Sequence, residues 1–312
     1  MIECFVPSAG AQLFCRVRGE GEPLLLIHGA VCDSDFFEDA ASALASEFCV
    51  VTYDRRGYSR SSGQLDESFL SASAKDAEQI CRQLFPAVSV SVVGCSAGGL
   101  IAMEFARRCP ELVKQLVLHE PPLPAFLPPC MEAQSTVRQI QNFLAQKKYI
   151  RAANRFLGLL EDADPSARPK PQEICEREER NLDFFIRNEF LPAFSSLPPA
   201  ALPASVFVTV GAGRGHQKHY LFQAAKTYAD KCNYPFRLLP GRHNCAWDRP
   251  LDFAKTVKEI LAGPVKSPQL PILNAKNRSR FTEDVKRLLF VALFLSRRLF
   301  CRYFQVSAAL YK

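Results

Sequence analysis

A single serine stands between small residues in the stretch VVGCSAGGLIAMEFA, which covers residues 92–106. The stretch begins as an apolar β-type segment and ends in a helical pattern, with Gly94, Ser96 and Gly98 in the spacing G-x-S-x-G between them. A tight turn from strand to helix holds its central side chain out of the sheet, and small neighbours permit the turn. The sequence therefore predicts that Ser96 is a nucleophile.

A serine hydroxyl is a poor nucleophile until a base accepts its proton, so a histidine must lie within hydrogen-bond reach. The chain contains five histidines, which are His28, His119, His216, His219 and His243. His28 belongs to a His-Gly-Ala element, and His119 ends a predicted strand. His216 and His219 flank a loop, and His243 follows the last predicted strand. The elements around them must decide which histidine serves.

Apolar runs of strand length alternate with helical patterns along much of the chain. The predicted strands cover residues 11–18, 24–27, 49–53, 88–93, 113–119, 205–210 and 236–239. The helices that follow these strands are predicted at residues 36–45, 73–84, 100–108, 219–231 and 251–262. Because parallel strands require a crossover connection, the alternation predicts an α/β fold with a mostly parallel, doubly wound sheet.

Residues 121–203 interrupt this alternation. A proline-rich entry, PPLPAFLPP, leads into helical patterns at residues 132–146, 150–160 and 171–188, with no strand pattern among them. We therefore expect a helical lid inserted between two strands of the sheet. The predicted organisation is a core of residues 1–120 and 204–263, a lid of residues 121–203, and a C-terminal extension of residues 264–312.

Three motifs in chain order resemble those of the α/β-hydrolase fold family, over residues 11–263. They are His28-Gly29-Ala30 after a buried strand, the GCSAGG turn around Ser96, and Pro240-Gly241-Arg242-His243 after the last strand. The resemblance implies that Ser96 is the nucleophile and His243 its base, with no cofactor and no metal. It also implies an oxyanion hole made by the backbone N–H groups of Ala30 and Ala97.

The acid of the expected triad departs from the family's commonest pattern. That pattern places an aspartate just after the strand at residues 205–210, yet residues 211–217 contain no carboxylate. Some family members carry the acid after the strand that follows the nucleophile helix, and there the motif VLHEPP supplies Glu120. The resulting order of serine, acid and histidine along the chain fits the fold.

Alternatives to Glu120 as the acid stay open. Glu120 could instead cap a lid helix or pair with Arg214 across the top of the sheet. Asp248 is a weaker rival, because it follows His243 and would break the expected chain order. With neither carboxylate, the site would run on a Ser96–His243 dyad or be inactive.

Other motifs near the predicted site have structural interpretations. The loop DRRGYSRS resembles the family's arginine-glycine loop, in which Asp54 and Arg55 would tie neighbouring loops together and Gly57 would permit the turn. The loop lacks the glycine spacing of a phosphate-binding motif. Cys95 is expected to pack under the nucleophile turn.

Three aromatic residues are candidates for an acyl pocket. They are Trp247 and, in the predicted lid, Phe184 and Phe185. Aromatic residues at such spacings also occur as plain core, so both interpretations remain.

Positive charge is concentrated at the C-terminus. The formal net charge is +7, but residues 264–312 hold ten lysines and arginines against two acids, which leaves −1 for residues 1–263. We therefore expect no nucleic-acid partner for this protein. Residues 285–304 mix apolar and basic side chains, a composition compatible with weak contact to a membrane surface or a protein. A helix packed on the core and an unstructured extension are the alternatives.

Cysteine usage and the N-terminus indicate the compartment. The twelve cysteines form no C-x-x-C pair, and the N-terminus MIECFVPSAG lacks the charged and apolar regions of a signal peptide. We expect a reduced, cytoplasmic location. The apolar run at residues 288–295 is far shorter than the roughly 20 residues that a spanning helix needs, so no transmembrane segment is predicted.

These observations predict a cofactor-independent serine hydrolase that cleaves a carboxylic ester or thioester of a small, apolar molecule. Carbon–carbon bond hydrolases, lactonases and perhydrolases keep the same serine and remain alternatives. A non-catalytic binding protein of the same fold is the rival from another class.

Overall fold

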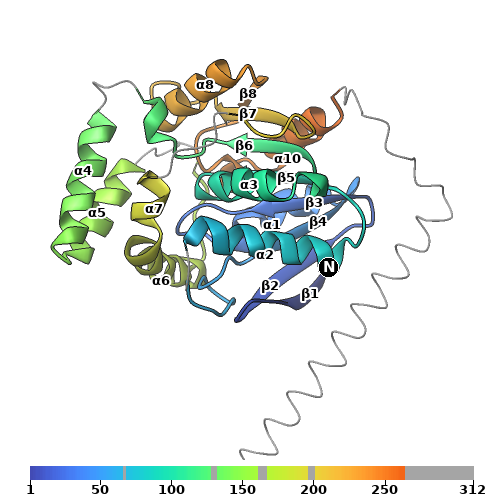
Figure 1. The fold of residues 1–312 in the computed structure, drawn as a ribbon, viewed down its shortest axis with the longest axis horizontal. Coiled ribbons are helices and arrows are strands. Elements are labelled where there is room, and N and C mark those ends of the chain that lie inside the picture. Colours follow the sequence, from blue (N-terminus) through green and yellow to red (C-terminus); the bar gives the residue numbers. More distant parts are fainter. Residues whose placement is uncertain (66–67, 128–131, 161–166, 196–200, 264–312) are drawn as a thin grey trace, which may run out of the picture.

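A single sheet organises the molecule in the computed structural model, which describes residues 1–65, 68–127, 132–160, 167–195 and 201–263 (Figure 1). Its eight strands are β1 (Ile2–Ser8), β2 (Ala11–Arg18), β3 (Glu22–Ile27), β4 (Phe48–Tyr53), β5 (Val90–Cys95), β6 (Val113–His119), β7 (Phe207–Gly213) and β8 (Phe236–Leu239). The strands lie in the order β1-β2-β4-β3-β5-β6-β7-β8. The pairs β1–β2 and β2–β4 are antiparallel, and the remaining pairs are parallel. The predicted α/β class, with a mostly parallel sheet, is confirmed.

Helices cover both faces of this sheet, because the strands are apolar on both sides. The core helices are α1 (Glu38–Leu44), α2 (Phe69–Leu84), α3 (Ala97–Arg108), α8 (Tyr220–Cys232), α9 (Cys245–Asp248) and α10 (Pro250–Leu261), with short 3-10 turns at Ser34–Phe37, Pro110–Leu112 and Pro124–Phe126. In β3, Leu25 and Ile27 belong to the apolar cluster under α2, α3 and α8. Leu24 and Leu26 belong to the opposite cluster under α1 and α10. The alternation along one strand thus fills two separate cores.

Four helices enter between β6 and β7. They are α4 (Glu132–Ala145), α5 (Tyr149–Leu159), α6 (Gln172–Asn188) and α7 (Phe190–Ser195), and we call them the helical insertion. Figure 1 shows them gathered at one end of the sheet, on the left of the view. Each buries one apolar stripe, as in α4, where the buried residues include Val137, Ile140 and Leu144. The helices predicted at residues 132–146, 150–160 and 171–188 are present with small shifts.

The differences from prediction lie in short elements and at the ends of longer ones, as in β7, which runs to Gly213 where a strand ending at residue 210 was predicted. Strand β1 was not predicted; it forms the edge of the sheet and pairs along its whole length with β2, from Ile2 opposite Val17 to Ser8 opposite Ala11. The short helices α7 and α9 were also missed, because one or two turns carry too little apolar periodicity. Helix α3 begins at Ala97, three residues before the predicted start, since its first turn is made of small residues.

Two features concern contact with a membrane, namely the helices of the described residues and the basic C-terminal extension. Within the residues that the structure describes, no helix combines the length and the apolar character needed to cross a bilayer. The basic extension at residues 264–312 lies outside the described residues. Its contact with a membrane surface or a protein stays a prediction.

Candidate active site

Ser96 lies at the turn between β5 and α3. Its backbone has a φ of 53° and a ψ of −125°, a sparsely populated conformation for a residue with a side chain. Glycines make this turn possible: a Cβ at Gly94 would lie 2.5 Å from the carbonyl oxygen of Gly98, and a Cβ at Gly98 would lie 2.2 Å from that of Ile27. The N–H of Ser96 donates to the carbonyl oxygen of His119 at 2.9 Å, so the turn is fixed to the end of β6.

Two backbone N–H groups lie on the segments that flank Ser96. Ala97 opens α3 directly after the serine, and Ala30 follows Gly29 beyond the end of β3. A Cβ at Gly29 would lie 2.9 Å from the Cβ of Ser96 and 3.5 Å from its Oγ, so the glycine backbone packs against the serine side chain. The positions of both residues beside Ser96 fit the two predicted oxyanion donors, and this role stays a prediction.

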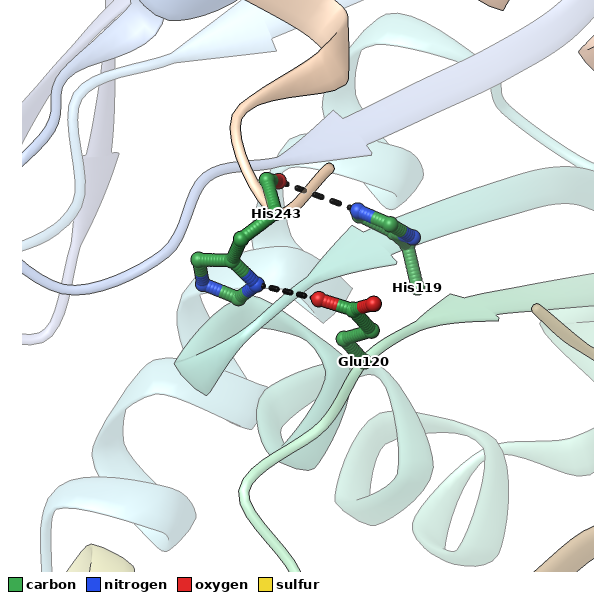
Figure 2. A group of neighbouring side chains, drawn as sticks. All are labelled: His119, Glu120 and His243. Carbon is green, nitrogen blue, oxygen red and sulfur yellow. Dashed lines mark hydrogen bonds and ion pairs between the residues drawn. The ribbon is translucent and has the colours of Figure 1, made fainter. Parts of the chain in front are cut away.

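His243 and Glu120 form a hydrogen-bonded pair at the same rim of the sheet (Figure 2). The Nδ1 atom of His243 lies 2.7 Å from Oε2 of Glu120. The other carboxylate oxygen, Oε1, accepts the N–H of Gly213 at 2.9 Å, and the N–H of Glu120 donates to the carbonyl oxygen of Gly211 at 3.0 Å. The last residues of β7 therefore hold the carboxylate in place. A donating Nδ1–H leaves Nε2 of the neutral imidazole as the proton acceptor.

The environment of Glu120 keeps its carboxylate ionised. Burial opposes the charge, but the hydrogen bond from His243, the two nearby imidazoles and the N–H of Gly213 outweigh burial and lower the pKa of Glu120 to about 2. A carboxylate so placed can orient the imidazole and stabilise its charged form.

His119 is a site residue that sequence reasoning did not assign. Its Nε2 lies 3.0 Å from the carbonyl oxygen of His243, so Nε2 carries the proton and donates (Figure 2). Its ring stacks on that of His243, with centroids 5.9 Å apart. Burial lowers the pKa of His119, which favours the neutral ring. The position next to Glu120 in VLHEPP was a signal for proximity, but nothing in the sequence indicated the bond to the His243 backbone.

Comparisons with known proteins agree with this architecture. Residues 22–159 match the profile of a family described as the alpha/beta hydrolase fold, a region that contains Ser96 and Glu120 and ends before His243. The protein named "Uncharacterized hydrolase YraK" from Bacillus subtilis (strain 168) is 25% identical over 258 residues, which cover 81% of this chain and 93% of the relative.

Solved structures show the same arrangement of strands and helices. The esterase EaEST from Exiguobacterium antarcticum matches with a TM-score of 0.65 at 17% identity, over 83% of this chain and 99% of that one. Est816, described as an N-acyl homoserine lactone degrading enzyme, matches with a TM-score of 0.63 at 21% identity, over 82% and 99%. The chain has the α/β-hydrolase fold. One fold hosts several chemistries, so the site itself must indicate the reaction.

Within the α/β-hydrolase fold, the structure separates the rival carboxylates. Asp248 accepts the N–H of Arg168 at 3.0 Å through Oδ1 and thereby joins α9 to the segment before α6. Arg214 donates its Nε to the carbonyl oxygen of Leu239 at 3.4 Å, whereas Glu120 is hydrogen-bonded to His243. Glu120 is thus the carboxylate that the fold places on the imidazole.

The predicted pocket aromatics lie in packed positions. The indole N–H of Trp247 donates to the carbonyl oxygen of Arg168 at 3.0 Å. Phe185 packs on Phe156 with ring centroids 4.9 Å apart, and Phe184 packs on Tyr58 at 5.4 Å. Their contacts tie the helical insertion together and to the core.

Cys95 and the arginine-glycine loop have the structural surroundings expected of them. Cys95 is buried beneath the turn, and burial raises the pKa of its thiol well above the ordinary value. Asp54 accepts the N–H of Ser34 at 2.9 Å and the N–H of Arg60 at 3.0 Å, which ties two loops together. Arg56 pairs with Asp76 at 2.6 Å in a buried setting.

One group of side chains in the described part of the chain has the composition of a metal site. It consists of His119, Glu120 and His243, whose candidate ligand atoms lie within 4.8 Å of one another. The hydrogen bonds between these residues already explain their proximity, since Glu120 holds Nδ1 of His243 and His119 holds its carbonyl oxygen. The arrangement fits a proton-transfer site better than a set of ligands converging on an ion.

Proposed function

We propose that this chain is a serine hydrolase that cleaves a carboxylic ester or thioester of a small, apolar molecule. The observation that carries the proposal is the 2.7 Å contact between His243 Nδ1 and Glu120 Oε2, at the rim where Ser96 occupies its strained turn. This contact gives the imidazole a fixed tautomer with Nε2 as the base.

The reaction would proceed in two halves. The Oγ of Ser96 attacks the carbonyl carbon while Nε2 of His243 takes the serine proton, and the N–H groups of Ala30 and Ala97 receive the developing oxyanion. The C–O or C–S bond then breaks, the leaving group takes the proton from His243, and an acyl-Ser96 intermediate remains. Water, deprotonated by His243, attacks the acyl carbon, the bond from that carbon to Oγ of Ser96 breaks, and His243 returns the proton to Oγ as the acid leaves.

The relatives and the helical insertion support the choice of reaction and substrate. The esterase among the structural relatives and the hydrolase YraK are compatible with hydrolysis of an ester. The helical insertion is rich in apolar side chains, and Phe156, Phe185 and Phe190 pack on one another in its interior. An insertion of this composition favours an apolar acyl group as the substrate.

A fluorophosphonate label and a substrate panel test the proposal. The wild type should be labelled at Ser96 and should hydrolyse at least one short ester or thioester, and Ser96→Ala should lose both properties. The loss of turnover should reach roughly 10⁶-fold, as for removal of the nucleophile in other triads. A folded wild type that resists labelling would instead support a binding protein of the same fold. Lactones belong in the panel, because one structural relative is described as degrading a lactone.

A further inference from the structure

A buried ion pair links the helical insertion to the loop that follows β4. Arg55 follows β4 and Glu189 lies between α6 and α7, and both side chains are 1% exposed. The Nη1 atom of Arg55 lies 3.2 Å and 2.9 Å from the two carboxylate oxygens of Glu189. Tyr58 adds its hydroxyl to Glu189 Oε2 at 2.8 Å, and the Arg55 guanidinium stacks over the Tyr58 ring at 4.2 Å.

The same guanidinium reaches the backbone beside the nucleophile. Its Nη2 lies 3.3 Å from the carbonyl oxygen of Gly29, and Nδ1 of His28 lies 2.9 Å from that same oxygen. The Nε2 of His28 accepts the backbone N–H of Arg55 at 3.0 Å, so Nδ1 carries the hydrogen and donates. Burial, followed by the charge of Arg55, lowers the pKa of His28 to about 3 and keeps the ring neutral. Two donors therefore hold one carbonyl oxygen.

Fixing this carbonyl also fixes the N–H of Ala30. The carbonyl of Gly29 and the N–H of Ala30 belong to one planar trans peptide group and point in opposite directions. Gly29 packs against the Ser96 side chain, so this peptide lies beside the nucleophile. A change in the direction of the Gly29 carbonyl would turn the Ala30 N–H away by the same angle.

Helix α6 holds the following residues as well. The side-chain amide of Asn181 donates to the carbonyl oxygen of Val31 at 2.8 Å and to that of Cys32 at 3.3 Å. Arg177 donates through Nε to Asp33 at 2.7 Å. The insertion is thus bonded to several successive residues of the segment that begins at Gly29.

We propose that Arg55 and Glu189 are positioning residues that orient the Gly29–Ala30 peptide toward the oxyanion, so that the helical insertion helps to set the catalytic geometry. The inference rests on the proposed function, because Ala30 acts as an oxyanion donor only in a hydrolase. Its physical basis is that an oxyanion donor must be held in place before charge develops. The position of the insertion then affects turnover as well as substrate binding.

Glu189→Gln and the double variant Arg55→Met/Glu189→Leu test the proposal. The first keeps the shape of Glu189 and removes its charge. The second removes both charges, and replacement of a buried ion pair by apolar side chains is often tolerated by the fold. Asp183→Asn is the matched control, because Asp183 lies in α6, the helix that precedes Glu189, in an exposed pair with Arg187. If Glu189→Gln does not fold, the double variant carries the test.

Two measurements distinguish positioning from a merely structural role. The kcat for the best ester should fall about 10- to 100-fold in both variants, with KM changed less than about threefold, while the control keeps both values. Backbone ¹⁵N order parameters of Gly29 and Ala30 should fall from about 0.85 toward 0.6 in the variants only. A loss confined to KM, or unchanged order parameters, would overturn the proposal. A wild type that hydrolyses no substrate would refute the proposed function. The order parameters would still show whether the Arg55–Glu189 pair holds the Gly29–Ala30 peptide.

Discussion

Gly29 lies so close to Ser96 that a methyl group on residue 29 would stand 2.9 Å from the serine Cβ, nearer than such atoms approach in proteins. Gly29→Ala should therefore displace either the serine or the adjoining Ala30 N–H. We expect kcat to fall roughly 10- to 100-fold in a folded protein. This decrease does not exceed the decrease in kcat that follows removal of one oxyanion donor. Steady-state kinetics with a chromogenic ester measures the change.

The control for this substitution is Gly158→Ala in α5, where an added Cβ meets nothing within 4 Å. It should leave kcat unchanged and raise the stability by up to about 1 kcal/mol, because glycine costs conformational entropy in a helix. Equal kcat values for Gly29→Ala and Gly158→Ala would show that the contact between Gly29 and the Ser96 side chain has no catalytic importance.

Glu120→Gln should lower turnover strongly and Asp248→Asn should not. The glutamine cannot stabilise a charged His243, and a comparable change in a serine protease cost about 10⁴-fold in kcat. Asp248 serves to accept the Arg168 N–H, which an asparagine oxygen can also do. Parallel kinetics on the two variants decide between the carboxylates, and a loss in Asp248→Asn alone would transfer the role of the acid to residue 248.

The ionisation of Glu120 should make stability depend on pH at its acidic end. Its pKa in the folded protein is about 2, below the ordinary 4.5, so the unfolded chain takes up the proton first as the pH falls. The stabilising contribution is complete above about pH 4.5 and is lost as the pH falls toward 2, with an upper limit of about 3 kcal/mol. Urea unfolding between pH 7 and pH 3 should show the advantage of the wild type over Glu120→Gln shrinking; a constant difference would contradict the assignment.

Asp76→Asn should destabilise the protein without changing its chemistry. Asp76 is buried against Arg56 and also accepts the Ser8 hydroxyl at 2.6 Å, so its loss leaves an uncompensated buried charge. We expect a decrease of about 3–5 kcal/mol in the free energy of unfolding. The exposed Asp183→Asn should change it by less than about 0.5 kcal/mol. Chemical denaturation measures both, and similar values would show that burial does not govern these pairs.

Much of the sheet could be predicted from sequence because apolar runs and helical periodicity are local. Strand β6 at Val113–His119 and strand β8 at Phe236–Leu239 coincide with their predicted ranges. Strand β1 could not be found this way, since four of its seven residues are exposed at the edge and its stability comes from pairing with β2. Pairing between strands is a tertiary property that a single segment does not reveal.

In the candidate site too, local sequence motifs could be predicted and contacts between distant residues could not. The G-x-S-x-G spacing at Ser96 is local, and the order of the motifs placed Glu120 and His243 near one rim. The bond from His119 to the His243 backbone joins residues 124 positions apart, and that from Arg55 to Glu189 joins residues 134 positions apart. Such contacts depend on how the insertion and the strand ends meet, which no spacing in one sequence records.

The sheet does not depend on the length or the sequence of the helical insertion between β6 and β7. Glu120 directly follows β6, and the sheet resumes after the insertion with β7 at Phe207. The backbone N–H groups of Ser96 and Glu120 donate to the ends of neighbouring strands and fix the reacting groups independently of the insertion. A segment of different length and sequence could be grafted between them to change the range of molecules accepted. On the proposed coupling, a successful graft would also have to bring a carboxylate to the guanidinium of Arg55.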